Sequence, residues 1–297
     1  MHEIHDRRLV RGGRGQTRVL ERGEGPAALV LLHGGLAGQS PYVGAAELWQ
    51  PLLDRLRVPR VLALDTPGVG ASTLSDFGEL TLTGTKAWLA AMLAELGAER
   101  VVLVGHGEAA LLALDCARER PEGIAVDGVA LVAGHTTAPA VAEMRNLTLL
   151  SPPPRWSAAS QRWALERLSY SAAHVTPELV ARLAEHTADE PHRRAAELLG
   201  DVDTALERAL DQGGAKAALY AHSRDVGFET PISIVWGAHD PLAPVEHGHG
   251  LFEVLSTTRA PLDFNVVTRC GHFPHRERPA EAARLIEPFA LRCLRDG

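Results

Sequence analysis

The amino-acid sequence predicts an α/β fold with a doubly wound, mostly parallel sheet covered by helices on both faces. Short apolar segments rich in β-branched residues alternate with segments of helical period over residues 1–135. The same alternation resumes at residue 231 and continues toward the last residue. The strands of a parallel sheet read as unbroken apolar runs because helices bury both of their faces.

The expected strands and helices follow from these runs in chain order. The runs that we expect to be strands cover residues 18–20, 27–32, 60–64, 101–104, 128–133, 231–236 and 262–267, with the first of them at an edge of the sheet. The helical patterns between them cover residues 47–56, 83–96, 110–118 and 246–255. Pro279 suits the first turn of a final helix, where a backbone N–H is not needed.

Residues 136–230 carry helical patterns but no convincing strand. We interpret this segment as a helical cap over the C-terminal edge of the sheet, inserted between the two parts of one core domain, 1–135 and 231–297. A separate helical domain is the alternative, which the return of strand–helix alternation directly afterwards disfavours. We expect apolar side chains of the cap to line a substrate pocket, namely Leu147, Leu149, Leu150, Trp156, Trp163 and Tyr170.

Composition excludes several classes of partner. A net charge of −7 argues against nucleic acid or an anionic membrane surface. No apolar run reaches the roughly 18 residues of a membrane-spanning helix, and no signal peptide is evident. The 3 cysteines have no C-x-x-C spacing, which indicates free thiols and a cytoplasmic location. Monomer and homodimer remain open.

The most informative motif follows the apolar run 101–104. The sequence Gly105-His106-Gly107-Glu108-Ala109 joins that run to a helical segment. A sharp turn from strand to helix with small flanking residues is a nucleophile elbow, whose central residue is normally a reactive side chain. Here the central residue is Gly107, which has no side chain to attack a substrate.

Other chemically useful residues also follow predicted strands. They are His33-Gly34-Gly35, the Gly- and Pro-rich turn 65–72, Asp240 and Gly271-His272. The carboxyl ends of parallel strands line one crevice, and the order elbow, acid, histidine is that of the α/β-hydrolases. With these motifs the chain resembles the α/β-hydrolase superfamily over almost its whole length. Within it, the chain is similar to the small capped esterases, lactonases and C–C bond hydrolases.

This resemblance implies roles for particular residues. Asp240 would orient His272, and His272 would act as a general base. The backbone N–H groups of Glu108 and of Gly35 or Leu36 would form an oxyanion hole. His33, Gly34 and the cap residues Trp156, Trp163 and Tyr170 would contact the substrate.

Each assignment has a simpler alternative. Asp240 could only cap a turn, and His272 could be structural. Glu108 could face the cavity as an acid or base, or equally be directed to solvent or paired with an arginine. Four histidines near the predicted strand ends lack the spacing of a metal site, so we expect solvated loop side chains and no metal: His239, His247, His249 and His275. The segment Gly68-Val69-Gly70 lacks G-x-G-x-x-G spacing, so we expect no dinucleotide and no other cofactor.

Three hypotheses account for Gly107. In the first, Gly107 is an engineered replacement of serine in an ordinary hydrolase. In the second, it is natural and leaves room for water or substrate beside His272, which permits hydrolysis without an acyl-enzyme, or a lyase, isomerase or cyclase reaction. In the third, the protein is a non-catalytic ligand-binding relative. We expect a small to medium apolar carbonyl substrate: an ester, a lactone or a compound with a scissile C–C bond.

Overall fold

A single sheet organises the molecule. The computed structural model describes residues 4–10, 15–36, 40–140 and 150–295. Its strands are β1 (His5–Val10), β2 (Gln16–Arg22), β3 (Ala27–Leu32), β4 (Val61–Leu64), β5 (Arg100–His106), β6 (Ala125–Val132), β7 (Ile232–Gly237) and β8 (Leu262–Val267). They lie in the order β1-β2-β4-β3-β5-β6-β7-β8. The strands from β4 to β8 pair in parallel, as predicted.

The first two strands are antiparallel to their neighbours, and one prediction about them is wrong. Residues 18–20 were expected at the sheet edge, but β2 lies between β1 and β4. The edge strand is β1, whose sequence HDRRLV has no apolar run that would indicate a strand. Charged residues are tolerated there because an edge strand needs backbone pairing on one side only.

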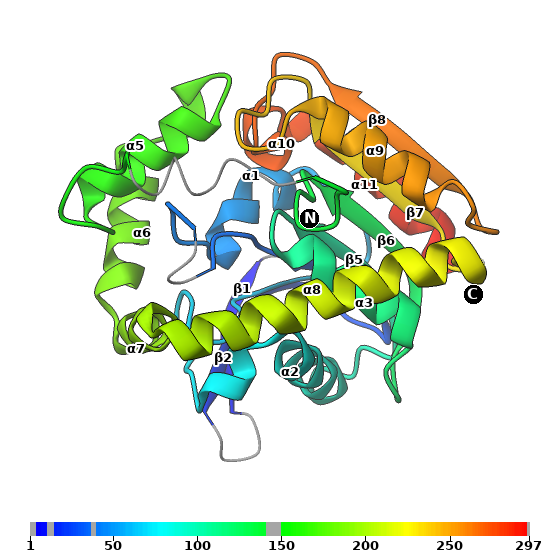
Figure 1. Cartoon of the computed structure of the whole chain (residues 1–297), viewed down its shortest axis with the longest axis horizontal. Coiled ribbons are helices and arrows are strands. Elements are labelled where there is room, and N and C mark those ends of the chain that lie inside the picture. The colour runs from blue at the N-terminus through cyan, green and yellow to red at the C-terminus, as the bar shows by residue number, and fades with distance from the viewer. Residues whose placement is uncertain (1–3, 11–14, 37–39, 141–149, 296–297) are drawn as a thin grey trace.

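Helices cover both faces of the sheet (Figure 1). One face carries α2 (Leu82–Glu95), α3 (Ala109–Glu119) and α9 (Val245–Leu255). The other carries α1 (Gln50–Leu53) and α11 (Pro279–Arg295), with the short helix α10 (Pro274–Glu277) beside them. The predicted doubly wound architecture is therefore confirmed. The helix expected at 47–56 is instead a 3-10 turn, η1 (Ala46–Trp49), followed by the short α1, although its apolar residues are buried as expected.

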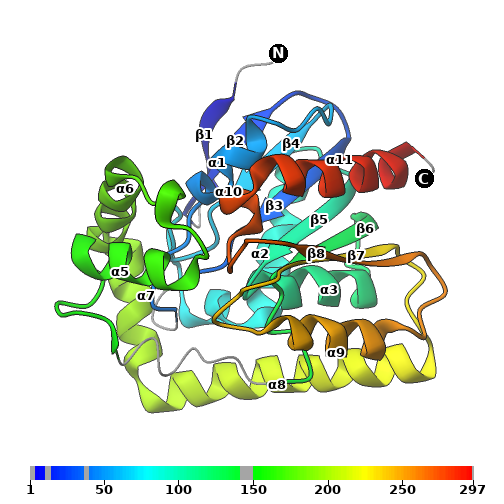
Figure 2. The same cartoon turned by 90° about the horizontal axis from the view of Figure 1, so that it is seen from above.

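The described part of the segment between β6 and β7 consists of helices joined by turns and irregular stretches, and it contains no strand. It contains α5 (Ala158–Leu168), the turn η3 (Ala172–His174), α6 (Pro177–Ala188), α7 (Glu190–Gly200) and α8 (Val202–Asp225), which we call the helical insert. Figure 2 shows α5, α6 and α7 gathered at one side of the sheet, while α8 runs from them past α3 and α9. Leu219 of α8 belongs to the core on that face. The insert thus both flanks the sheet's edge and contributes one helix to the core layer.

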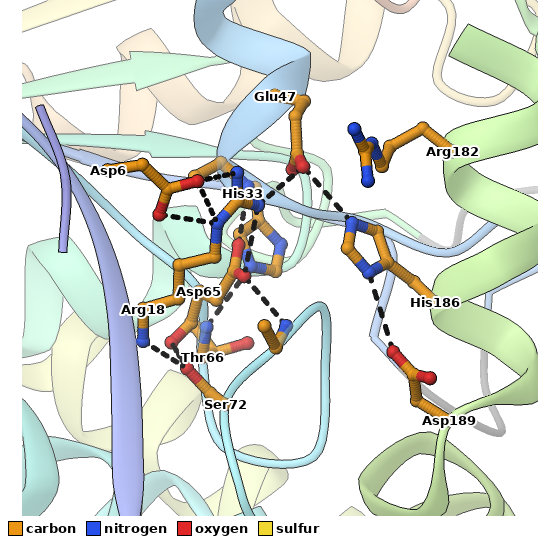
Figure 3. A network of polar contacts seen from close by, with 12 residues as sticks. Asp6, Arg18, His33, Glu47, Asp65, Thr66, Ser72, Arg182, His186 and Asp189 are labelled. Carbon is orange, nitrogen blue, oxygen red and sulfur yellow. Dashed lines mark hydrogen bonds and ion pairs between the residues drawn. The ribbon is translucent and has the colours of Figure 1, made fainter. Parts of the chain in front are cut away.

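A polar network ties the insert to the sheet (Figure 3). Arg18 of β2 donates to Asp6 at 3.0 Å and to Glu47 of η1. Glu47 also contacts His186 of α6, with 3.2 Å between the carboxylate and Nε2. Burial alone would raise the pKa of Glu47, but His186 and Arg18 outweigh it and lower the pKa to about 2. Glu47 is therefore a charged link between two layers of the fold.

The His186 contact predicts a pH-dependent stability. Burial lowers the pKa of His186, but the hydrogen bond and charge of Glu47 outweigh burial and raise it above its ordinary value of 6.5. The stabilisation from this pair is therefore complete below pH 6.5 and is lost as pH rises through the raised pKa. We expect His186→Gln to lower the free energy of unfolding by about 1 kcal/mol at pH 6 and by less at pH 9. Equal losses at both pH values in chemical denaturation would contradict this prediction.

Candidate active site

Position 107 lies at the sharp turn between β5 and α3. Gly107 has φ +56°, a left-handed conformation that glycine adopts easily. A Cβ placed on Gly107 would lie 3.4 Å from Nε2 of His272 and 3.5 Å from Cε1 of His135. The turn has the geometry of the predicted elbow, and its missing side chain faces two imidazoles.

His272 and Asp240 are in direct contact. Nδ1 of His272 lies 2.8 Å from Oδ2 of Asp240, and both side chains are buried. The other oxygen of Asp240 accepts from the N–H groups of Leu242 at 2.9 Å and Ala243 at 3.1 Å. Asp240 thus caps its turn and also holds the imidazole, so the two readings of Asp240 are both realised in the geometry.

The aspartate determines the state of the imidazole. Burial lowers the pKa of His272, but the charge and hydrogen bond of Asp240 outweigh it and raise the pKa above its ordinary value. Because the carboxylate accepts at Nδ1, neutral His272 carries its proton there and presents a lone pair at Nε2. Nε2 is buried and has no hydrogen-bond partner among the described residues. This lone pair faces the space at position 107.

Glu108 points inward, not to solvent. Its carboxylate accepts from the N–H of Gly35 at 2.9 Å and from the Ser40 hydroxyl. Burial raises the pKa of Glu108, but nearby His135 and these hydrogen bonds outweigh it and lower the pKa to about 2. Glu108 is therefore ionised at neutral pH and has no proton to donate.

This arrangement changes the expected oxyanion hole. One of the predicted donors, the N–H of Gly35, is directed at the Glu108 carboxylate. The expectation that Gly35 stands free for a substrate oxygen therefore does not hold, because a protein anion already accepts from it. Gly34 permits this, since a Cβ there would lie 2.7 Å from Oε2 of Glu108. Leu36 lines a neighbouring hollow.

Two further residues border the site and were not found from the sequence. His135 follows β6, its ring centre lies 5.5 Å from that of His272, and its Nδ1 is buried without a described partner. Burial lowers the pKa of His135 despite the Glu108 charge, so the ring is neutral at pH 7. The hydroxyl of Tyr42 is also buried without a described partner. A histidine just past a parallel strand was a usable signal for His135; nothing in the local sequence indicated Tyr42.

His33 does not reach a substrate pocket. Its Nε2 accepts from the N–H of Thr66 at 3.1 Å, and its Nδ1 lies 2.9 Å from the carbonyl oxygen of Gly34. The ring is fully buried. His33 therefore joins two loops, and its predicted contact with substrate is not supported.

The aromatic residues predicted to line a substrate pocket contact other side chains among the described residues. Trp156 packs edge-on against His192, and Trp163 packs on the apolar cluster of the insert. Tyr170 is 50% exposed and stacks on His239. These aromatic side chains are absent from the lining of the hollow beside Glu108. Of the other predicted pocket residues, Leu150 is exposed, while Leu147 and Leu149 lie outside the described residues.

The four histidines near the predicted strand ends differ in their surroundings. Within the described ranges, no group of His, Cys, Asp and Glu side chains is placed to hold a metal ion. His275 was expected in solvent but is fully buried against Trp49 and His106.

The described helices also include none long and apolar enough to cross a bilayer.

Fold and site together define the class of protein. A family model for the alpha/beta hydrolase family matches residues 29–285, and the chain belongs to this family of hydrolases. It is 25% identical over 274 residues to a 2-hydroxy-6-oxo-6-phenylhexa-2,4-dienoate hydrolase of Comamonas testosteroni, covering 91% of this chain and 89% of that protein. It is 25% identical to a 2-hydroxy-6-oxononadienedioate/2-hydroxy-6-oxononatrienedioate hydrolase of Pseudomonas putida, covering 92% and 91%.

Solved structures agree on the fold. A meta-cleavage product hydrolase from Pseudomonas fluorescens superposes with a TM-score of 0.75 at 22% identity, covering 97% of this chain and 98% of that one. A 2-hydroxy-6-oxo-6-phenylhexa-2,4-dienoate hydrolase from Rhodococcus gives a TM-score of 0.71 at 22% identity, covering 98% and 100%. The α/β-hydrolase fold predicted from the motifs is confirmed.

Proposed function

We propose that this protein is an enzyme in which His272, held by Asp240, acts as a general base on a small to medium apolar carbonyl compound, without a covalent acyl-enzyme. The observation that carries the proposal is the partnerless Nε2 of His272, which faces the space above Gly107. A lone pair beside a space without a nucleophile can remove a proton from water or from the substrate itself.

Hydrolysis by this route needs no nucleophilic side chain, because water supplies the attacking oxygen and His272 carries the proton. Nε2 takes a proton from water as the water oxygen bonds to the carbonyl carbon, and the carbonyl π electrons move to its oxygen. When the carbonyl re-forms, the bond to the leaving carbon or oxygen breaks, and the leaving atom takes the proton back from His272. The substrate would be an ester, a lactone or a ketone with a scissile C–C bond, because the relatives' names describe hydrolases of 6-oxo compounds.

The developing negative oxygen needs a donor other than Gly35. The N–H of Gly35 already serves the ionised Glu108, and a second anion beside that carboxylate would be repelled. The ring of His135 also borders position 107, with its Cε1 3.5 Å from where a Cβ would stand, so we assign its ring N–H as the donor to the carbonyl oxygen. The same pair of histidines could also move a proton between two carbons, so isomerisation or elimination is the second candidate, favoured by the two imidazoles that border position 107.

Turnover tests this proposal with three probes: p-nitrophenyl butyrate, a δ-lactone and 2-hydroxy-6-oxo-6-phenylhexa-2,4-dienoate. We expect turnover of at least one, rising with pH through the raised pKa of His272, because only the neutral ring accepts a proton. Mass spectrometry should find no acyl adduct, and a fluorophosphonate should not inhibit. His135→Gln should lower kcat about tenfold or more with a smaller change in KM. A trapped acyl-enzyme, or no turnover of any probe, contradicts the proposal.

A further inference from the structure

A hollow lies next to Glu108, between residues of α3 and α8, and His272 is not among the residues that line it. Its apolar lining includes Leu36, Val69, Leu80, Leu82, Leu111 and Leu112. The space free of protein atoms is about 550 Å³ including the part open to solvent, but the centre of a water-sized sphere fits in only about 40 Å³. The hollow is therefore narrow and suits a slender apolar chain better than a bulky ring system.

One cation lies in this apolar lining. Arg208 of α8 is 3% exposed, and its Nε and Nη1 are buried without a hydrogen-bond partner among the described residues. Burial lowers the pKa of Arg208 to about 10, although the charges of Glu108 and Asp211 act in the opposite direction. The guanidinium thus stays charged at neutral pH. A buried charge without partners is unfavourable unless something pairs with it.

The other buried arginines show how this chain normally treats such a group. Arg22 donates to the carbonyl oxygens of Leu53 and Leu56. Arg60 donates to Glu21 and to several carbonyl oxygens, and Arg276 donates to the carbonyl oxygens of Glu47 and Leu48. Arg208 differs from these, because its buried donors are directed at neither backbone nor carboxylate among the described residues.

The nearby carboxylates do not fill this role. Glu108 makes no ion pair with Arg208 within 4.0 Å, and its oxygens already accept from Gly35 and Ser40. Asp211 accepts from the N–H of Leu82 and from Thr83. A ligand anion could therefore pair with Arg208 without displacing a described hydrogen bond.

We propose that this hollow binds a slender apolar monocarboxylate, with its carboxylate on Arg208 and its chain along the leucines. The two buried donors of Arg208 without a described partner, Nε and Nη1, can bond the oxygens of a carboxylate. The carboxylates of Glu108 and Glu79 in the same lining disfavour a dianion such as a phosphate ester. Glu108 borders both this hollow and the elbow, so the bound acid would lie beside the reacting space. The statement that this ligand is the substrate or product rests on the proposed function. The statement that the hollow binds it does not.

Calorimetry with hexanoate and its neutral isostere hexanamide tests the site. We expect hexanoate to bind the wild-type protein at least tenfold more tightly than hexanamide. Arg208→Met should weaken hexanoate binding at least tenfold and leave hexanamide unchanged, while Arg208→Lys keeps part of the preference. Arg182→Met is the matched control, because Arg182 is exposed on α6 and pairs only with Glu185 among the described residues. Equal hexanoate affinity in wild type and Arg208→Met overturns the proposal, as does no hexanoate binding.

Thermal unfolding separates a ligand site from a structural role. If Arg208 is unpaired until ligand binds, Arg208→Met removes an uncompensated buried charge and should raise the Tm of the ligand-free protein. A lower Tm would mean that Arg208 is paired within the fold, and would overturn the proposal. Hexanoate binding should persist in His272→Ala, so a protein that binds hexanoate through Arg208 but turns over no carbonyl probe would refute the proposed function alone.

Discussion

Replacing His272 with alanine is expected to lower kcat/KM by about 10²–10⁴-fold, because the Nε2 lone pair that faces position 107 belongs to the imidazole that Asp240 holds and polarises. Asp240→Asn should cause a loss of similar order. An amide at residue 240 no longer stabilises the imidazolium and can reverse which ring nitrogen carries the proton. The measurement is the steady-state rate with whichever carbonyl probe the wild-type protein turns over.

His239→Ala is the matched control for this prediction. His239 lies one residue before Asp240, but its side chain is exposed and stacks on Tyr170. We expect it to keep the wild-type rate. A His272→Ala protein that is folded by circular dichroism and retains the wild-type rate would falsify the general-base role of His272.

Installing the missing nucleophile should have the second large effect, and Glu108 should control its size. A serine at position 107 would place its Cβ 3.4 Å from Nε2 of His272, an ordinary contact that lets the hydroxyl reach the lone pair. The Glu108 carboxylate nevertheless occupies the Gly35 donor and repels a developing oxyanion. We therefore expect Gly107→Ser alone to react slowly with a fluorophosphonate, and Gly107→Ser/Glu108→Ala to react about 10²-fold faster or more.

A third variant separates the effect of the negative charge at residue 108 from the effect of its hydrogen bond with the Gly35 N–H. In Gly107→Ser/Glu108→Gln the amide oxygen can still accept from Gly35, but the negative charge is gone. Its labelling rate should fall between the other two variants, measured by intact-protein mass spectrometry over time. If removing Glu108 does not accelerate labelling, then the carboxylate does not obstruct the oxyanion donors. The single variant also tests whether the elbow is otherwise competent, which the engineered reading of Gly107 requires and the natural reading does not.

Much of the fold could be predicted because its signals are local. The unbroken apolar runs of β3, β5 and β7 each report burial on both faces of a parallel sheet, and the residues after them fall at one edge by geometry alone. That is why Asp240 and His272 could be paired although they are 32 residues apart. The edge strand β1 was missed because its residues carry no apolar pattern.

Side-chain directions could not be predicted in the same way. Trp156, Trp163 and Tyr170 have the composition of a pocket, but their partners are side chains on the insert and the β7 loop. The sequence around Arg208 does not distinguish it from the other charged residues of a long polar helix. Only the path of α8 past α3 buries it in an apolar hollow.

The positions of most strands along the chain and the pairing of Asp240 with His272 follow from patterns a few residues long, since hydrophobic period and strand-end position do not depend on distant segments. The direction of Glu108 does depend on them. Its carboxylate is held by Gly35 and Ser40, about 70 residues earlier in the chain, and Gly34 leaves the room for it. Long-range packing alone decided that in this hydrolase fold the partnerless Nε2 of His272 lies near position 107 while the Glu108 carboxylate accepts from Gly35.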